Sequence, residues 1–275
     1  MGTILKLTSI GNYNILDKAA GLNEPSGLTL NQEGTALYTI SDDTKAIFQL
    51  DLKGRLSVKD SFFIGMDDLE GIAITPDGKQ LLVVQEESNS IISFDLASRQ
   101  ELSRRPISAM SNYKSIREHF PDPPDNKGLE GITVNTHNNH VFVVKEGKPG
   151  LLIEIDPERE KILNSRLLRA DNGFKHPKVG PKSLDFSGLS YDSTRDTLWI
   201  TSDKGQCLFH YDWSRDQVIQ RLDLTIDSEG QSSKIRKSEG LAIDPQRGRL
   251  YVVSERDGRL YVFRIHEQDL SLIHI

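Results

Sequence analysis

Carboxylates recur in this sequence at a fixed distance from a short glycine phrase. The phrase occurs five times, and the residue before its glycine is Ser26, Glu70, Glu130, Ser187 or Glu239. Fifteen residues after each glycine stands an acid that closes an apolar run: Asp42, Glu86, Glu146, Asp203 and Glu255. Carboxylates gathered in this way can bind a hard cation or act as general acids and bases.

The segments around these acids have the pattern of β-strands. Each phrase opens a short β-like run, and turn residues such as those of Thr75 to Gly78 separate it from a second run rich in β-branched and aromatic residues. A third run follows in every unit, and a fourth, more variable run such as Leu56 to Ile64 leads into the next unit. Four antiparallel strands per repeat predict a propeller blade.

Five such units predict an all-β protein that is a single five-bladed β-propeller over residues 1–275, with blades beginning near residues 24, 68, 128, 185 and 237. Apart from a short helix expected around Ser111 to His119, no helical segment separates the strands, which excludes a βαβ fold. A strand over Asn14 to Asp17 is expected to close the ring beside blade five, which removes an open sheet edge. Residues Leu270 to Ile275 either extend that blade or form a tail.

Blade geometry predicts where the acids lie. The first strand of a blade lines the channel, and its beginning shares a face of the disc with the end of the antiparallel second strand. The glutamates of the phrases and the five strand-two acids should therefore converge on one mouth, and Ser26 and Ser187 complete the inner set as ligand-binding candidates. The glycine that follows lets neighbouring backbones approach closely at the axis.

Eight carboxylates around a narrow opening repel one another, so a compensating charge is expected. An oxygen-only set without clustered histidine or cysteine suits Ca²⁺, with Mg²⁺ or Mn²⁺ as alternatives. The predicted metal ligands are Asp42, Glu70, Glu86, Glu130, Glu146, Asp203, Glu239 and Glu255. A structural interpretation competes with this one, because acids at strand ends also accept hydrogen bonds from loop amides and a repeat copies such a device into every blade.

Two long connections between blades, Ser108 to Lys127 and Ala170 to Asp185, are expected on the same face as the acids and are candidate lids. The first contains Tyr113, Lys114, Arg117, His119 and Phe120. The second offers Lys175, His176, Lys178 and Lys182 as ligand-binding candidates for an anion held against the metal. The alternative is a solvated loop that balances local charge.

Three functions fit these residues. The first is a Ca²⁺-binding propeller whose acidic mouth recognises a small-molecule or protein ligand. The second is a metal-dependent hydrolase of a phosphate ester or lactone, with Glu130 or Glu239 as the catalytic base. The third is a protein-interaction platform in which the acids are structural.

Composition narrows the classes of partner. The net charge of −6 and pI near 5.7 argue against nucleic acid as a partner. The single cysteine, Cys207, is expected to fill space in a strand, and neither a membrane span nor a signal peptide is visible. Any targeting segment would have been removed before this sequence begins.

The phrases together resemble the bacterial SdiA-regulated family across nearly the whole chain. The resemblance rests on Gly128-Leu-Glu-Gly-Ile132 with Val144-Lys-Glu146, on Asp185-Phe-Ser-Gly188, and on Lys237-Ser-Glu-Gly-Leu241 with Val252-Val-Ser-Glu255. It implies a five-bladed propeller, often in the periplasm or tethered to the cell envelope. A more distant likeness is to phytase-like esterase domains, which implies phosphate-ester chemistry by analogy.

Overall fold

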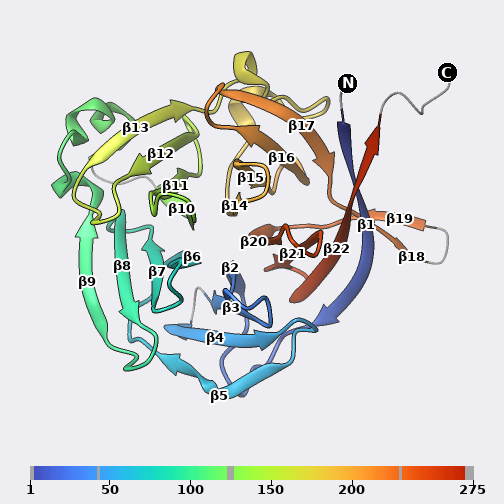
Figure 1. The fold of residues 1–275 in the computed structure, drawn as a ribbon, viewed down its shortest axis with the longest axis horizontal. Coiled ribbons are helices and arrows are strands. Elements are labelled where there is room, and N and C mark those ends of the chain that lie inside the picture. Colours follow the sequence, from blue (N-terminus) through green and yellow to red (C-terminus); the bar gives the residue numbers. More distant parts are fainter. Residues whose placement is uncertain (1–2, 42–43, 123–126, 229–230, 270–275) are drawn as a thin grey trace.

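The computed structural model describes residues 3–41, 44–122, 127–228 and 231–269. Five four-stranded antiparallel sheets stand around a central axis, each with its first strand innermost (Figure 1). The predicted five-bladed propeller is therefore confirmed.

The first three blades follow one another along the chain. Blade one consists of β2 (Pro25–Leu30), β3 (Ala36–Ser41), β4 (Ala46–Asp51) and β5 (Leu56–Phe63). Blade two consists of β6 (Leu69–Ile74), β7 (Gln80–Gln85), β8 (Ser90–Asp95) and β9 (Glu101–Pro106). Blade three consists of β10 (Leu129–Val134), β11 (Val141–Lys145), β12 (Leu151–Ile155) and β13 (Ile162–Leu167).

Blade four consists of β14 (Leu189–Asp192), β15 (Thr197–Ser202), β16 (Cys207–Asp212) and β17 (Gln217–Asp223). A separate hairpin, β18 (Thr225–Ser228) and β19 (Gln231–Lys234), follows it. Blade five combines β20 (Ser238–Asp244), β21 (Arg249–Ser254) and β22 (Arg259–Asp269) with β1 (Thr3–Asn14) from the other end of the chain.

An N-terminal strand closes the ring, as predicted, but this strand lies earlier in the sequence than expected. β1 pairs with β22 from Thr3 opposite Asp269 to Asn14 opposite Arg259, so the closing strand ends where the prediction had it begin. Asp17 instead forms an isolated bridge with Leu22, and its carboxylate accepts the N–H of Ala20, which makes this segment a turn. The C-terminal residues after Asp269 lie outside the described part of the chain.

Apolar clusters between neighbouring blades hold the ring together. The central strands are almost wholly buried because a blade lies on each side of them, as the six buried residues of β15 illustrate. Trp199 is fully buried between blades four and five, and Trp213 packs edge-on against Phe142 at a centroid distance of 5.0 Å. Cys207 is buried in the core between blades three and four, as the sequence predicts.

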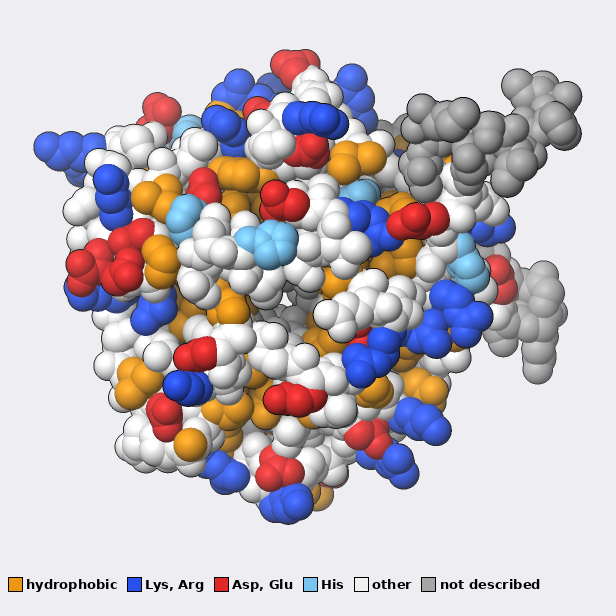
Figure 2. Space-filling model, in the orientation of Figure 1, with side chains coloured by type: hydrophobic (Ala, Val, Ile, Leu, Met, Phe, Trp, Pro, Cys, Tyr) orange, Lys and Arg blue, Asp and Glu red, His pale blue; other side chains and the backbone are white. Residues whose placement is uncertain are grey.

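The five phrase glycines form a closed ring of backbone contacts around the axis. A methyl group at Gly71 would lie 2.3 Å from the carbonyl oxygen of Glu130, and one at Gly131 would lie 2.2 Å from that of Ser187. Gly240 meets Gly27 in the same way at 2.4 Å, which completes the circle. No larger residue fits at these positions without displacing the neighbouring blade. Figure 2 shows how narrow the resulting opening is at the centre of one face.

Candidate functional site at the channel mouth

A cavity of about 330 Å³ lies where the inner strands begin. Eight residues that the sequence placed at one mouth line it together: Ser26, Glu70, Glu130, Glu146, Ser187, Asp203, Glu239 and Glu255. Asp42 lies outside the described residues, and Glu86 lies beside the cavity, within reach of its carboxylates. The structure thus brings the inner and outer sets together, although they come from all five blades.

A bulge at the start of the first strand positions each glutamate of the inner set. In blade two, Leu69 pairs with Gln85 and Gly71 with Val84, so Glu70 is an extra residue without an opposite partner. Glu130 and Glu239 occupy the same position in blades three and five. A β-bulge redirects its side chain, and here the three carboxylates come to line the channel mouth.

The acids are densest at the seam between blades two and three. Carboxylate oxygens of Asp68, Glu70 and Glu86 all lie within 4.8 Å of one another, and so do those of Glu86, Glu130 and Glu146. Glu86 belongs to both groups, so the two groups adjoin at its side chain. Asp68 was missed in the sequence because it stands outside the repeated phrase; its positive φ of 61° is the structural sign of a special position.

Burial and mutual repulsion raise the pKa of carboxyl groups at this seam. Burial, followed by the carboxylates of Glu70 and Glu239, raises the pKa of Glu130 well above its usual range. Burial also raises the pKa of Glu86, against the hydrogen bond that it accepts from Gly128. A cation bound between these side chains would offset the repulsion and favour their ionised forms.

The opposite half of the mouth, at blades four and five, carries more positive charge. Lys237 donates to Glu255 at 2.7 Å, and its backbone N–H donates to Asp203 at 2.6 Å. Lys204 lies 3.5 Å from Asp185, an acid that lines the cavity but was not predicted as a site residue. Burial, with Asp203 and Glu255 nearby, raises the pKa of Glu239 to about 7.

Some of the strand-two acids also join neighbouring blades. Glu86 of blade two accepts the N–H of Gly128 from blade three at 2.8 Å, and Asp203 of blade four accepts the N–H of Lys237 before blade five. Lys127 donates to Glu146 at 2.5 Å. These contacts agree with the structural interpretation for Glu86 and Asp203. Among the inner glutamates, Glu70 accepts a hydrogen bond from the hydroxyl of Ser26 in blade one at 3.2 Å.

Among their described residues, the two long loops line the mouth only through the last ones. Lys127 and Asp185 line the cavity, whereas Lys175, His176, Lys178 and Lys182 do not belong to its described lining. His176 accepts the N–H of Val179 at 3.0 Å, and its pKa is lowered by burial and by Arg221 and Lys234, which places it beside β17 and β19. The predicted anion-binding role of these four residues stays a prediction.

Fold and mouth define the chain as a five-bladed β-propeller with a carboxylate-lined channel. The family model described as SdiA-regulated matches residues 13–264, so the chain belongs to the SdiA-regulated family, as its phrases indicated. No described helix is both long and apolar enough to cross a membrane.

Solved structures share the architecture at low sequence identity. A glutaminyl cyclase from Myxococcus xanthus matches with a TM-score of 0.64 and 14% identity, over 96% of this chain and 97% of that chain. Hydrazine synthase from Kuenenia stuttgartiensis matches with a TM-score of 0.52 and 12% identity, over 89% and 96%. The Cps50 (Swd1) propeller domain of Myceliophteria thermophila matches with a TM-score of 0.50 and 11% identity, over 88% and 96%. These likenesses show the fold alone.

Proposed function

We propose that the channel mouth binds a divalent cation at the seam between blades two and three and uses it to recognise a ligand. The observation that carries this proposal is the pair of three-carboxylate groups that share Glu86. Among the described residues of these groups all potential ligand atoms are carboxylate oxygens, which hard cations prefer.

Ca²⁺ fits this arrangement best. It accepts six to eight oxygen ligands in flexible geometry, and the three carboxylates of one group, each binding through one or both oxygens, meet that number with a few waters. Mg²⁺ and Mn²⁺ need a smaller, nearly octahedral set, so they are the weaker alternatives. Seven carboxylates but only three lysines line the cavity, which leaves negative charge for a cation to neutralise.

The rest of the cavity supports recognition of a small molecule. Its volume of about 330 Å³ is at the lower end of the range for ligand sites. Ser26 and Ser187 supply hydroxyl groups, although each already donates to a backbone carbonyl of the next blade, at 2.8 and 2.9 Å. A ligand oxygen that completes the coordination of the cation would lie among these groups.

The test is a thermal-shift titration with Ca²⁺, Mg²⁺ and Mn²⁺ after chelation. A cation at about one hundred times its Kd should raise the melting temperature by about 5 °C, because it binds only the folded chain. Glu130→Gln should abolish that shift, and the matched control Glu158→Gln, an exposed acid away from the mouth, should retain it. Absence of a saturable shift, or an equal shift in Glu130→Gln, would refute the proposal.

A second candidate function is metal-assisted hydrolysis of a phosphate ester or a lactone. The observation that favours it is Glu239, whose pKa of about 7 suits a general base at neutral pH. The rate should rise with pH through about 7 as Glu239 loses its proton, and Glu239→Gln should remove that rise. The rate of hydrolysis is measured on a panel of phosphate esters and lactones with Ca²⁺, Mg²⁺ and Mn²⁺ present. No turnover of any compound would exclude hydrolysis of these substrates.

A further inference from the structure

Lys127 is the last residue of the long loop that follows β9. The earlier part of that loop contains three short 3-10 turns, η2 (Ile107–Ala109), η3 (Tyr113–Ser115) and η4 (Arg117–His119), where the sequence predicted a short helix. These turns border a cavity of about 1200 Å³ at the outer edge of the ring, near β9 and β13 (Figure 1). Among the described residues of the loop, Lys127 alone lines the channel mouth.

The start of blade three fixes the position of Lys127. The N–H of Gly128, the next residue, donates to the carboxylate of Glu86 at 2.8 Å, and the N–H of Glu146 donates to the carbonyl of Gly128 at 3.0 Å. Gly128 is tightly enclosed, because a methyl group there would lie 2.8 Å from Cγ of Glu86. The backbone beside Lys127 is therefore held between two members of the group of Glu86, Glu130 and Glu146.

The side chain of Lys127 supplies a cation to this same group. Its ammonium donates to Glu146 at 2.5 Å, and the two side chains are only 26% and 18% exposed. Carboxylate oxygens of Glu86 and Glu130 lie within 4.8 Å of one of Glu146. The hydrogen bond to Glu146, with the charges of Glu130 and Glu86, raises the pKa of Lys127, so its ammonium stays charged. The group thus already holds a cation, and that cation belongs to the chain itself.

The other lysines around the mouth have different partners. Lys237 is paired with Glu255 and Lys204 with Asp185, in the opposite half of the cavity. Among the described lysines and arginines, Lys127 is the one that forms an ion pair with a member of either three-carboxylate group. Its position therefore distinguishes it from the cations that only balance the outer acids.

We propose that Lys127 is an internal cation that regulates the mouth by competing with the divalent cation for Glu86, Glu130 and Glu146. This inference rests on the cation binding proposed above. In the metal-free chain the ammonium neutralises part of the charge of the three acids. A divalent cation carries twice that charge and coordinates several oxygens at once, whereas an ammonium group donates single hydrogen bonds. The divalent cation displaces the ammonium as it enters, so this exchange sets the concentration at which it binds.

Isothermal titration of the full chain with Ca²⁺ tests the exchange. Lys127→Met removes the competing charge, so the Kd for Ca²⁺ should fall by about tenfold or more. Lys127→Arg keeps the charge and should stay close to the wild type. Lys204→Met is the matched control, because it removes the same charge from the opposite half of the same cavity, and its effect on the Kd should be clearly smaller.

The displacement has a direct signature in the reactivity of the amine. Added Ca²⁺ should speed the reductive methylation of Lys127 in the wild type, because the amine no longer donates to Glu146. Lys204 in the same chain is the internal control, and its rate should not change. Peptide mass analysis measures both rates, and a methylation rate of Lys127 that ignores saturating Ca²⁺ would contradict the displacement.

The outcomes separate failure of this inference from failure of the proposed function. With a chelator present, Lys127→Met should melt about 4 °C below the wild type, because the three acids lose their internal counter-ion. An unchanged melting temperature would overturn the inference, whatever Ca²⁺ does. Equal Kd values in the wild type and Lys127→Met would also overturn it and leave the proposed cation binding intact. Binding of Ca²⁺ to Lys127→Met but not to the wild type would refute the proposed function and support the competition.

Discussion

Polar residues at the two faces of the propeller differ in their hydrogen-bond partners. At the face opposite the mouth, the fourth residue after each phrase glycine is polar, and its side chain accepts a backbone N–H from its own turn. These residues are Asn31, Thr75, Asn135, Asp192 and Asp244. This bond to the turn recurs in all five blades.

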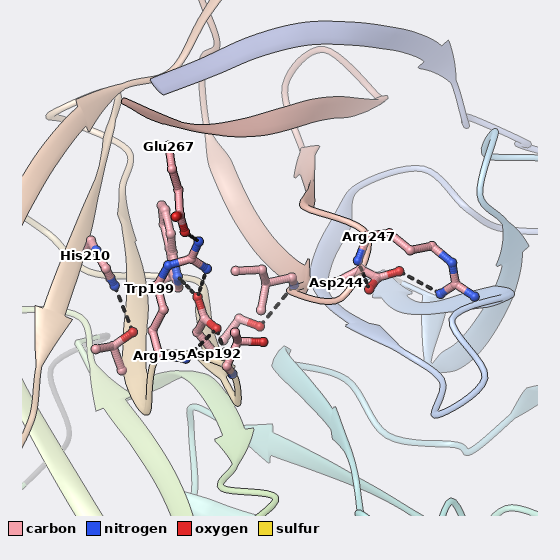
Figure 3. A network of polar contacts seen from close by, with 11 residues as sticks. Asp192, Arg195, Trp199, His210, Asp244, Arg247 and Glu267 are labelled. Atoms are coloured by element: carbon pink, nitrogen blue, oxygen red, sulfur yellow. Dashed lines mark hydrogen bonds and ion pairs between the residues drawn. The ribbon is translucent and has the colours of Figure 1, made fainter. Parts of the chain in front are cut away.

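Asp192 shows how completely a carboxylate can be satisfied on that face. It is fully buried and accepts bonds from the turn N–H of Thr194, from the guanidinium of Arg195 at 2.9 Å and from the indole of Trp199 at 3.2 Å. Figure 3 shows this network beside the simpler pair of Asp244 and Arg247. At the seam of the mouth, by contrast, Glu86 accepts the N–H of Gly128 and Glu146 accepts from Lys127, while their other neighbours include carboxylate oxygens within 4.8 Å. A repeated acid is therefore a ligand candidate where donors are few and a structural element where they are plentiful.

The largest expected effect comes from the satisfied acid. Asp192→Ala should lower the free energy of unfolding by about 3 kcal/mol, because it leaves the indole N–H of the fully buried Trp199 without its acceptor and leaves Arg195 with only the exposed Glu267 as a partner. Urea unfolding measures the loss, and the response to Ca²⁺ should not change. A loss below about 1 kcal/mol would show that the network contributes little to stability.

On both faces, the features that recur in every blade could be predicted from the sequence. The fifteen-residue spacing fixed the hairpin geometry, so the convergence of Glu70, Glu130 and Glu239 on one mouth followed from strand direction alone. The closing strand was misplaced because β1 has no glycine phrase to mark it, and its alternation in Thr3–Asn14 is broken by polar residues and a bulge at Ser9 to Gly11.

What the sequence could not predict depends on contacts between blades and on loop paths. Asp68 joins the seam because the N–H of Glu86 donates to its carbonyl and brings the two residues together. Its position, three residues before the phrase glycine, also carries an acid in Glu24 and Asp185, a signal that the sequence reasoning did not use. The loop around Lys114 was expected near the mouth because its ends are there. Its course to the rim is set by burial of Ile116 and by the pairing of Ser111 with blade three, which are long-range contacts.

A smaller effect, the dependence of stability on pH, is expected from the acids at the mouth. In the metal-free chain the pKa of Glu239 is about 7, above the ordinary value of 4.5, so the folded state holds more protons than the unfolded state between these values. Stability should therefore increase by about 2 kcal/mol as the pH falls from 8 to 5. Glu239→Gln should flatten this slope in urea unfolding measured with a chelator. A wild-type stability that rises with pH over this range would contradict the raised pKa.

The smallest effect is expected at the exposed member of the structural face. Arg247 lies 2.8 Å from Asp244, but its side chain is 54% exposed, so water and salt screen the pair. Arg247→Gln should lower the free energy of unfolding far less than Asp192→Ala does, because the turn N–H still donates to Asp244 at 3.0 Å. Urea unfolding beside Asp192→Ala measures the difference directly. Equal losses of stability in the two variants would mean that burial does not distinguish the network of Asp192 from that of Asp244. The contrast between the two faces would then depend only on the acids at the mouth.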